Sequence, residues 1–537
     1  MSSAWNDAAA RRPNFARLQR QALAAFAQGQ LDKAERLCAG ILEHRHEDFD
    51  ALQLLGLLKL QRRRPAEALG LLSKALKVNS SSAEAMSNLG LALHAAGRYE
   101  EAAANFRNAL TLAPGHPEIL HNLGNACLEL GRLDEALANY DEVLAKNPVH
   151  AGTLVNQGNA LLRLNRPIDA IASFDRALAL MPGHPNILTN RGHALRRLDR
   201  PVEALADFKA ALVKAPEFAE AHFESGMARL SLGDFGGWKQ YEWRWRTAAF
   251  AGRRRQFRAP LWLGDAPLRG QSVLLHAEQG FGDTIQFIRY APLLAGRGAK
   301  VTCEVQPQLH ALLSQLEGVE VIAEGEPLPR FDLHCPLLSL PLAFGTTADT
   351  VPSRMPYLVP AADHLAYWRD RLAGGGPRAG FVWSGSSFHN NDANRSIPLA
   401  SLTAVFDHSP FSCFSLQTEL RDADGEVLRA IPGLVHLGGE LRDFADTAAV
   451  ISLLDVVVSV DTAVAHLAGA LGKPVVILLP FAADFRWMRH RGDSPWYPTA
   501  KLIRQPAFGD WVSVVSRLAG ILRIMADPEA GALRYLR

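Results

Sequence analysis

A 34-residue period runs through the first half of the chain and restricts what that half can fold into. Small residues and prolines recur at fixed offsets within each period. They are Gly56, Gly90, Gly124, Gly158, Gly192 and Gly226, then Ala68, Ala102, Ala136, Ala170 and Ala204, and Pro114, Pro148, Pro182 and Pro216. Self-similarity at a fixed period of this length indicates a solenoid of stacked helical units.

Aromatic residues keep the same period and complete the packing pattern. They are Phe106, Tyr140, Phe174 and Phe208. Gly and Ala let two helices approach closely, the ring fills the gap, and Pro ends the second helix. This combination is the tetratricopeptide signature. Ala22 and Ala34 fit the frame one unit earlier, so we predict about seven units over residues 15–247, with atypical caps at both ends.

One polar position also follows the period, two residues before the glycine. It holds Asn88, Asn122, Asn156 and Asn190, and Asn125 and Asn159 form a second short row. Such a row forms a ladder along a solenoid, and Asn can both donate and accept. We predict that the ladder grips the backbone of an extended peptide. The alternative is that each Asn bonds the neighbouring repeat or faces water.

Size, charge and cysteine usage exclude several classes of protein. The 537 residues suffice for several domains, and a net charge of +2 argues against a dedicated nucleic-acid binder. The five cysteines are far apart, without the spacing of a zinc site or a disulfide framework. The stretch MSSAWNDAAARRPNF has no apolar core of signal-peptide length, and no run approaches the ~18 apolar residues of a membrane span. We therefore expect a cytoplasmic protein.

An aromatic and basic segment, residues 248–270 with the residues just before it, separates the two halves. Five large aromatic residues crowd together there: Trp238, Tyr241, Trp243, Trp245 and Trp262. We expect them to pack the last repeat helix against the next domain. The run Arg253 to Arg255 is either a solvated connector or a contact for an acidic ligand.

The second half alternates strands with helices, which is typical of parallel sheets. We predict two Rossmann-like domains over residues 271–376 and 377–525, with a helix at 284–294 and a last helix at 511–525. Ligands in such sheets bind at the carboxyl ends of the strands. The loops after Glu278, Gly385, Gln417 and Val460 should therefore line one cleft.

The stretch from Asp461 to Pro474, DTAVAHLAGALGKP, lies between the apolar runs DVVVSV and VVILLP. A strand, a tight turn, a short helix and a strand are predicted. The start of such a helix binds anions through its free N–H groups and its dipole. Thr462 and Ala463 would make these contacts while Asp461 shapes the turn. In the alternative, Asp461 is only an N-cap. His466 either lines the site or packs against the sheet.

The companion loops supply the other candidate residues. Arg395, with Ser396 after it, would add bidentate hydrogen bonds to a diphosphate at the helix start, and Gln417 begins another loop of the cleft. Asp283, after Gly282 in a glycine-rich turn, would be a general base, or else only an N-cap. The run Asp422 to Asp424 opens a helix more readily than it binds a metal.

Two of these motifs carry a family resemblance. DTAVAHLAGALGKP and QGFGDTIQF resemble the signature loops of the heptosyltransferase-like glycosyltransferases of the GT-B fold, and the likeness extends over residues 260–522. With the repeats, the layout is similar to O-linked N-acetylglucosamine transferases and to bacterial repeat-bearing glycosyltransferases, including those that modify flagellin. The resemblance implies a nucleotide sugar held by Thr462, Ala463 and Arg395. It also implies Asp283 as the base, no metal or other cofactor, and inversion.

One residue departs from the pattern, because the family motif has Gly where this chain has Ala463.

The leading hypothesis is a glycosyltransferase acting on Ser or Thr of a protein recruited by the repeats. The alternatives are transfer to a saccharide or lipid-linked acceptor, with the repeats as a scaffold, and a repeat adaptor without catalysis.

Overall fold

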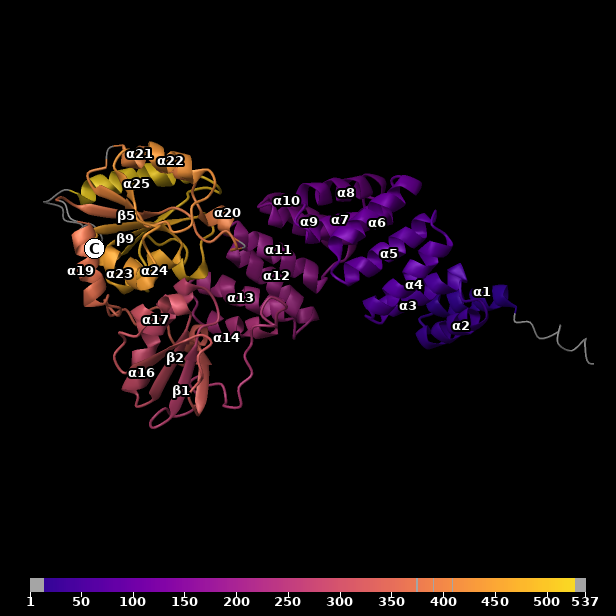
Figure 1. The fold of residues 1–537 in the computed structure, drawn as a ribbon, viewed down its shortest axis with the longest axis horizontal. Coiled ribbons are helices and arrows are strands. Elements are labelled where there is room, and N and C mark those ends of the chain that lie inside the picture. Colours follow the sequence, from indigo (N-terminus) through magenta and orange to yellow (C-terminus); the bar gives the residue numbers. More distant parts are fainter. Residues whose placement is uncertain (1–13, 373–374, 390, 408, 527–537) are drawn as a thin grey trace, which may run out of the picture. The chain divides into compact units, whose positions relative to one another are not determined.

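The computed structural model describes residues 14–372, 375–389, 391–407 and 409–526 (Figure 1). The chain divides into two compact units, Met1–Asn190 and Arg191–Arg537. Helix α11 (Pro185–Arg197) crosses this division. The last repeat helices therefore belong to the same compact unit as the sheets that follow them.

The first unit is a run of paired helices, as the 34-residue period predicts. Its helices are α1 (Phe15–Ala27), α2 (Leu31–His44), α3 (Phe49–Gln61), α4 (Pro65–Val78), α5 (Ala83–Ala95), α6 (Tyr99–Leu112), α7 (Pro117–Glu129), α8 (Leu133–Lys146), α9 (Ala151–Arg163) and α10 (Pro167–Leu180). The pattern continues in the second unit with α12 (Pro201–Lys214), α13 (Ala219–Ser231) and the short α14 (Gly237–Tyr241). The tetratricopeptide solenoid is confirmed.

The repeats that hold Gly90, Gly124, Gly158 and Gly192 are closed by this glycine and the periodic ring, whereas Gly56 faces Leu72 instead. A Cβ on Gly124 would lie 2.5 Å from Cε1 of Tyr140, and the same approach joins Gly90 to Phe106. The Tyr140 ring is fully buried. The periodic prolines stand two residues beyond the ends of α6, α8, α10 and α12, where they cannot interrupt a helix.

The second unit contains two parallel sheets. The four-stranded sheet has the order β3-β2-β1-β4, and the six-stranded sheet has the order β10-β9-β8-β5-β6-β7. The strands are β1 (Ser272–His276), β2 (Lys300–Val305), β3 (Val319–Ala323), β4 (Leu333–Pro336), β5 (Arg378–Val382), β6 (Ser412–Ser415), β7 (Leu434–His436), β8 (Val456–Val460), β9 (Val475–Leu479) and β10 (Ala500–Arg504). The predicted class, a solenoid followed by an α/β GT-B fold of two Rossmann-like sheets, is confirmed.

We call the four-stranded sheet with its helices the first lobe and the six-stranded sheet with its helices the second lobe. The first lobe has α15 (Phe281–Phe287), η3 (Ile288–Tyr290), α16 (Ala291–Gly296), α17 (Pro307–Leu313), η4 (Leu337–Ser339) and α18 (Leu340–Ala343). The second has α20 (Asp392–Arg395), η5 (Leu399–Leu402), α21 (Thr403–Phe406), α22 (Asp424–Ala430), α23 (Phe444–Ser452), α24 (Ala463–Ala470), η6 (Phe485–Trp487) and α25 (Trp511–Met525), while α19 (Ala362–Arg371) precedes β5.

Two details differ from the predicted elements. The helix expected over residues 284–294 is present but not uniform: α15 ends at Phe287, the 3₁₀ turn η3 follows, and α16 begins at Ala291. Pro292 explains the change to a 3₁₀ turn, because it lacks the N–H that a continuous α-helix needs there. Strand β10, at the edge of the second sheet, was not predicted.

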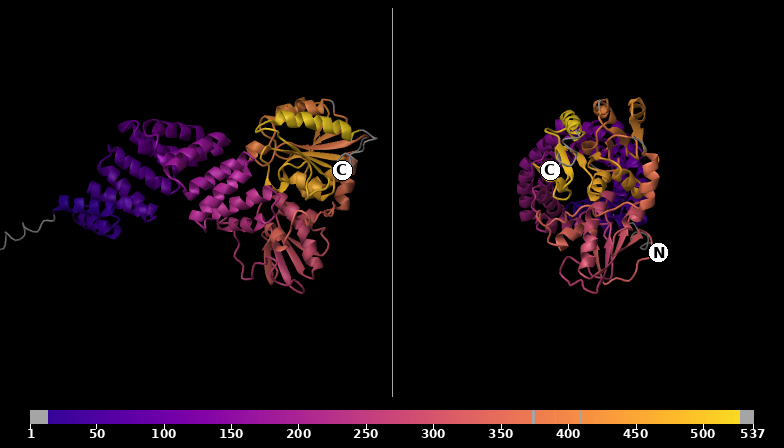
Figure 2. Two further views of the ribbon diagram at one scale, coloured as in Figure 1. Left: turned by 180° about the vertical axis from the view of Figure 1, so that it is seen from behind. Right: turned by 90° about the vertical axis from the view of Figure 1, so that its left-hand side faces the viewer.

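Alternating residues of the second sheet face two different cores. Val456, Val458 and Val460 of β8 pack with α25, whereas Val457 packs with α23 and α24. Figures 1 and 2 show α25 on one face of the sheet and α23 and α24 on the other. Because both faces are covered, β8 is an unbroken apolar run that ends at the turn before α24.

The aromatic segment joins the last repeat to both lobes, as expected. The Trp238 ring lies edge-on to Phe287 of the first lobe at 5.9 Å and to Phe485 of the second lobe at 5.5 Å.

Of the three consecutive arginines, Arg253 and Arg254 are exposed and Arg255 forms an ion pair with Glu304. Of the helices that the structure describes, none has both the length and the apolar character needed to span a bilayer.

The repeat packing predicts a contrast between two Gly→Ala substitutions. Gly124→Ala would press on the buried Tyr140 ring, whose hydroxyl also donates to Asn125 Oδ1 at 2.8 Å. We expect it to lower the free energy of unfolding by about 1–3 kcal/mol. Gly70→Ala in α4 meets nothing within 4 Å, and it should raise stability by about 0.5–1 kcal/mol. Urea unfolding followed by circular dichroism measures both; equal stability of the two variants contradicts the packing argument.

Candidate functional site

The candidate site lies where strand order reverses in each sheet. Strand β1 pairs with both β2 and β4, and β5 pairs with both β6 and β8. Ligands bind beyond the carboxyl ends of strands at such switch points. The loops after β1, β5 and β8 carry most of the predicted site residues. All three therefore lie beside a switch point.

Asp283 is the third residue of α15, directly after the turn that follows β1. Its Oδ2 accepts the N–H of Gly280 at 3.0 Å, so it does close the first turn of the helix. The residue at the N-cap is Gly280, not Asp283. Burial raises the pKa of the Asp283 carboxyl, and the neighbouring Arg486 guanidinium opposes this shift.

The stretch after β8 forms the predicted turn and helix. Thr462, rather than Asp461, is the N-cap of α24, so the alternative role for Asp461 as the cap is wrong. The Thr462 hydroxyl lies 2.9 Å from the Ser459 hydroxyl. Asp461 is buried, and burial together with Asp484 raises the pKa of its carboxyl. A less charged Asp461 repels an anion at this helix start less strongly.

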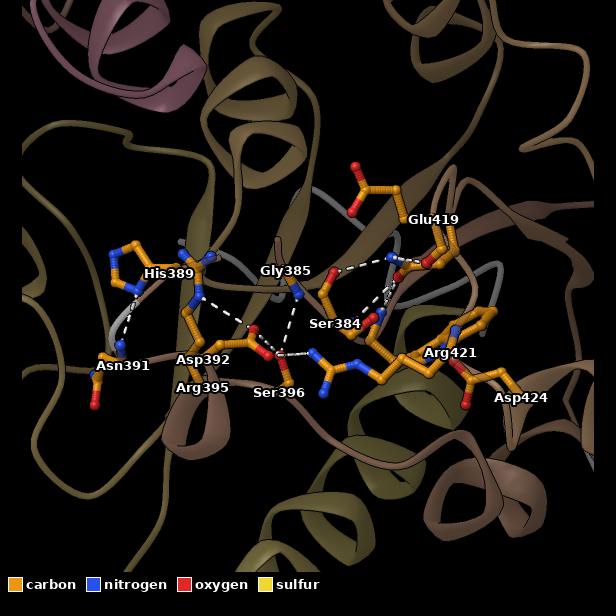
Figure 3. Close-up of polar contacts among 12 residues, drawn as sticks. Ser384, Gly385, His389, Asn391, Asp392, Arg395, Ser396, Glu419, Arg421 and Asp424 are labelled. Carbon is orange, nitrogen blue, oxygen red and sulfur yellow. Dashed lines mark hydrogen bonds and ion pairs between the residues drawn. The ribbon is translucent and has the colours of Figure 1, made fainter. Parts of the chain in front are cut away.

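Arg395 reaches this turn from the neighbouring loop after β5. Its Nη1 donates to the carbonyl oxygen of Asp461 at 3.0 Å. Gly385 makes room for it, because a Cβ there would lie 2.4 Å from Arg395 Nη2. Figure 3 shows Arg395 and His389 on this same loop, and the Arg395 charge acts on the His389 ring. Asn390 is outside the described residues. The structure thus brings the predicted arginine to the predicted helix start.

Ser396 fixes this loop rather than projecting from it. Its hydroxyl accepts the N–H of Gly385 at 3.1 Å and donates to Asp392 Oδ1 at 2.7 Å. Arg421 forms an ion pair with Asp392 and also lies 3.2 Å from the Ser396 hydroxyl (Figure 3). Arg421 was not predicted, and it connects the loops after β5 and β6.

Gln417 has the same kind of role. Its Oε1 accepts the N–H groups of Trp383 at 3.2 Å and Ser384 at 3.1 Å. Its Nε2 donates to the carbonyl oxygens of Ser384 at 3.0 Å and Glu419 at 3.1 Å. Since both ends of the buried amide bind backbone, Gln417 shapes the loops after β5 and β6.

The predicted acidic run opens a helix, as expected. Asp424 begins α22, and its Oδ2 accepts from Trp383 Nε1 at 2.9 Å. Among the described residues, the group with spacing suited to a metal is elsewhere, at His364, Asp443 and Asp446. Asp446 already accepts hydrogen bonds from Arg442 and Trp368, which occupy its oxygens.

The two lobes meet at Gly282 and His466. Helix α15 packs against α24, and a Cβ on Gly282 would lie 2.7 Å from His466 Cδ2. His466 cannot easily move, because its Nδ1 is 2.9 Å from the Tyr497 hydroxyl and its ring stacks on Trp487 at 5.2 Å. Burial lowers the pKa of His466 well below its usual value. His466 therefore packs between α15 and these two rings, and its Nε2 lies 3.9 Å from Asp461 Oδ1 in the turn before α24.

Besides Arg421, two further charged residues of this region were missed from the sequence. Arg486, in the loop after β9, donates from Nη2 to Asp283 Oδ1 at 2.6 Å. The fully buried Arg244 donates to Glu278 Oε1 at 2.9 Å, beneath the glycine-rich turn. Burial raises the pKa of Glu278 to about 7 even so. The only signal for Arg486 is its place beyond the carboxyl end of a core strand.

The asparagine ladder, in the first unit, hydrogen-bonds between successive repeats. Asn156 Nδ2 donates to Asn125 Oδ1 at 2.8 Å, and Asn190 Nδ2 donates to Asn159 Oδ1 at 3.0 Å. Asn88, which is buried, donates to Gln53, and Asn122 is half-buried. The structure therefore shows the hydrogen bonds between neighbouring repeats that were the alternative to peptide binding for this row of asparagines.

The contact at Gly282 predicts a second contrast. Gly282→Ala would drive a methyl group into His466, which is fixed by Tyr497 and Trp487. We expect the free energy of unfolding to fall by about 1–3 kcal/mol. Gly296→Ala, at the end of α16 with nothing within 4 Å, is the matched control and should leave stability nearly unchanged. Thermal unfolding compares them, and a wild-type melting temperature for Gly282→Ala would show that the helices separate at little cost.

Parts of the chain match two known protein families. Residues 54–117, 93–154 and 189–237 match tetratricopeptide repeats. Residues 421–488 match glycosyltransferase family 9 (heptosyltransferase). The latter segment contains α24 and Arg486 but neither Asp283 nor Arg395.

Similar proteins include Protein FlbA of Caulobacter vibrioides, which is 28% identical over 339 residues. That likeness covers 58% of this chain, and the chain spans 56% of the length of FlbA. Among solved structures, YrrB, a TPR protein with an unusual peptide-binding site, is 22% identical with a TM-score of 0.29, covering 34% of this chain and 95% of YrrB. A thermophilic TPR protein of Thermus thermophilus is 25% identical with a TM-score of 0.30, covering 34% and 99%. The chain thus combines tetratricopeptide repeats with a region that matches the heptosyltransferase family of glycosyltransferases.

Proposed function

We propose that the protein transfers a sugar from a nucleotide-diphosphate donor to a Ser or Thr hydroxyl of a protein recruited by the repeats. The observation that carries the proposal is the meeting of α15 and α24. It brings Asp283 of the first lobe to the same site as the helix start that Arg395 reaches in the second lobe. Flagellin is one class of acceptor protein to test.

The diphosphate binds at the start of α24. The N–H groups of Thr462 and Ala463 and the helix dipole favour negative charge there. Arg395, which already touches the Asp461 carbonyl, adds charge-assisted hydrogen bonds. These groups stabilise the charge that develops on the leaving diphosphate, which is often the largest contribution to such a reaction.

Asp283 accepts the proton of the acceptor hydroxyl. The hydroxyl oxygen attacks the anomeric carbon of the sugar, the bond from that carbon to the diphosphate oxygen breaks, and the electron pair leaves with the diphosphate. Burial raises the pKa of Asp283, which makes the ionised carboxylate a stronger base. This single displacement inverts the anomeric carbon and needs only side chains and backbone of this chain.

Replacement of the base tests the mechanism. Asp283→Asn keeps the size of the side chain but cannot take a proton, so kcat should fall by about 10²–10⁴-fold. Nucleotide-diphosphate affinity, measured by calorimetry, should change little. Intact-mass spectrometry of an acceptor incubated with nucleotide sugars gives the rate. Unchanged transfer by this variant would remove Asp283 from the mechanism.

Replacement of the arginine tests the donor site. Arg395→Gln removes charge-assisted hydrogen bonds worth about 1.5–3 kcal/mol, so nucleoside-diphosphate affinity should fall by about 10–100-fold. Arg371→Gln removes an exposed arginine paired with Glu440 and is the control. Calorimetric titration with UDP, GDP and ADP compares both variants. Equal affinities would place the diphosphate elsewhere, and no binding by wild type would favour the adaptor hypothesis.

The hydrogen bonds between asparagines of successive repeats favour a second candidate. In this case the repeats are a scaffold, and the acceptor is a saccharide or a lipid-linked sugar of the cell envelope. Asn122→Ala with Asn156→Ala separates the candidates. Loss of protein modification with wild-type nucleotide binding and melting temperature supports peptide feeding, whereas unchanged modification excludes the ladder as the peptide site.

A further inference from the structure

Arg486 is a largely buried arginine that contacts residues of both lobes. It lies in η6, and its side chain is 11% exposed. Three carboxylates surround it: Asp283 of the first lobe and Asp461 and Asp484 of the second. Burial disfavours the charged guanidinium, but these carboxylates outweigh burial and raise the pKa of Arg486 further. Arg486 is therefore a fixed positive charge beside the proposed base.

The contacts of Arg486 determine how the Asp283 carboxylate is oriented. Arg486 Nη2 donates to Asp283 Oδ1 at 2.6 Å, while the N–H of Gly280 donates to Oδ2 at 3.0 Å. Both oxygens are thus held, one from each lobe. The carboxylate cannot turn about its Cβ–Cγ bond without losing one of these hydrogen bonds.

Arg486 is itself held in place by its own loop. Asp484 Oδ1 accepts the backbone N–H of Arg486 at 3.1 Å and lies 3.4 Å from its Nη1. Phe485, the residue between them, packs against the junction ring of Trp238. The guanidinium therefore has little freedom, and its position depends on a loop that contacts the last repeat.

We propose that Arg486 is a positioning residue, which orients the Asp283 carboxylate across the two lobes and keeps it ionised. This inference rests on the proposed function, because it requires Asp283 to act as the base. The competing explanation is an ion pair that only joins the lobes. Such a pair affects stability without changing the protonation behaviour of the reaction.

The charges around Asp283 give the two explanations different pH dependence. Arg486 lowers the pKa of the Asp283 carboxyl, and Asp484 raises it. Glu278 in the turn after β1, Tyr241 in α14 and His389 in the loop after β5 also face Asp283. Asp461, in the turn after β8, and His466 of α24 face Arg486. A base works only when it is ionised, so activity is lost as the pH falls through its pKa.

The test is the pH profile of kcat/KM for three variants. Arg486→Gln should lower kcat by about 10²-fold through misplacement of the carboxylate. Its acid limb should move to higher pH, because the positive charge that favours ionised Asp283 is gone. Asp484→Asn removes a like charge, so its acid limb should move to lower pH. Arg486→Lys keeps the charge and should restore the wild-type limb with part of kcat.

Controls separate this role from loss of structure. Arg491→Gln removes a nearby arginine paired with Asp493 and should retain the wild-type profile. In an Asp283→Asn background, Arg486→Gln should cause no further loss of kcat. The proposal is overturned if wild type transfers sugar but the acid limbs of Arg486→Gln and Asp484→Asn stay in place. If wild type transfers sugar from no donor, the proposed function fails first and this inference fails with it.

Discussion

The contact between α15 and α24 is the interaction on which the site depends. Each helix begins just beyond the end of a buried strand, and the two belong to different lobes. They can approach because Gly282 has no side chain to meet His466, which Tyr497 and Trp487 hold in place. Without this approach, the carboxylate of one lobe and the helix start of the other would have no common site.

Sequence reasoning succeeded where one residue type has to recur or where a buried strand must end. The repeats follow from the glycine and ring positions because a ring such as Tyr140 fits only against a missing side chain. The turn at Asp461 and Thr462 follows from two apolar runs that a short helix must separate. In both cases local pattern and tertiary packing require the same residues.

Sequence reasoning failed where the function of a residue depends on a partner far away in the chain. Arg486 lies 203 residues from Asp283, and no local pattern connects them. Gln417 and Ser396 were placed at the correct sheet edge, but their hydrogen bonds to the loop backbone decide that they brace it. Position at a sheet edge is thus predictable from sequence, whereas the direction in which a polar side chain points is not.

The ring of Trp238 has a consequence for how such proteins can change in length. It contacts Phe287 and Phe485 at once, so the final helical hairpin is part of the core that joins the two lobes. Among the residues that the structure describes, this core includes Leu230 and Trp238 but no residue of α1 to α10. Duplication or loss of whole 34-residue units is therefore tolerable toward the N-terminus, where it alters the reach of the solenoid, while the last hairpin must be inherited together with the sheets.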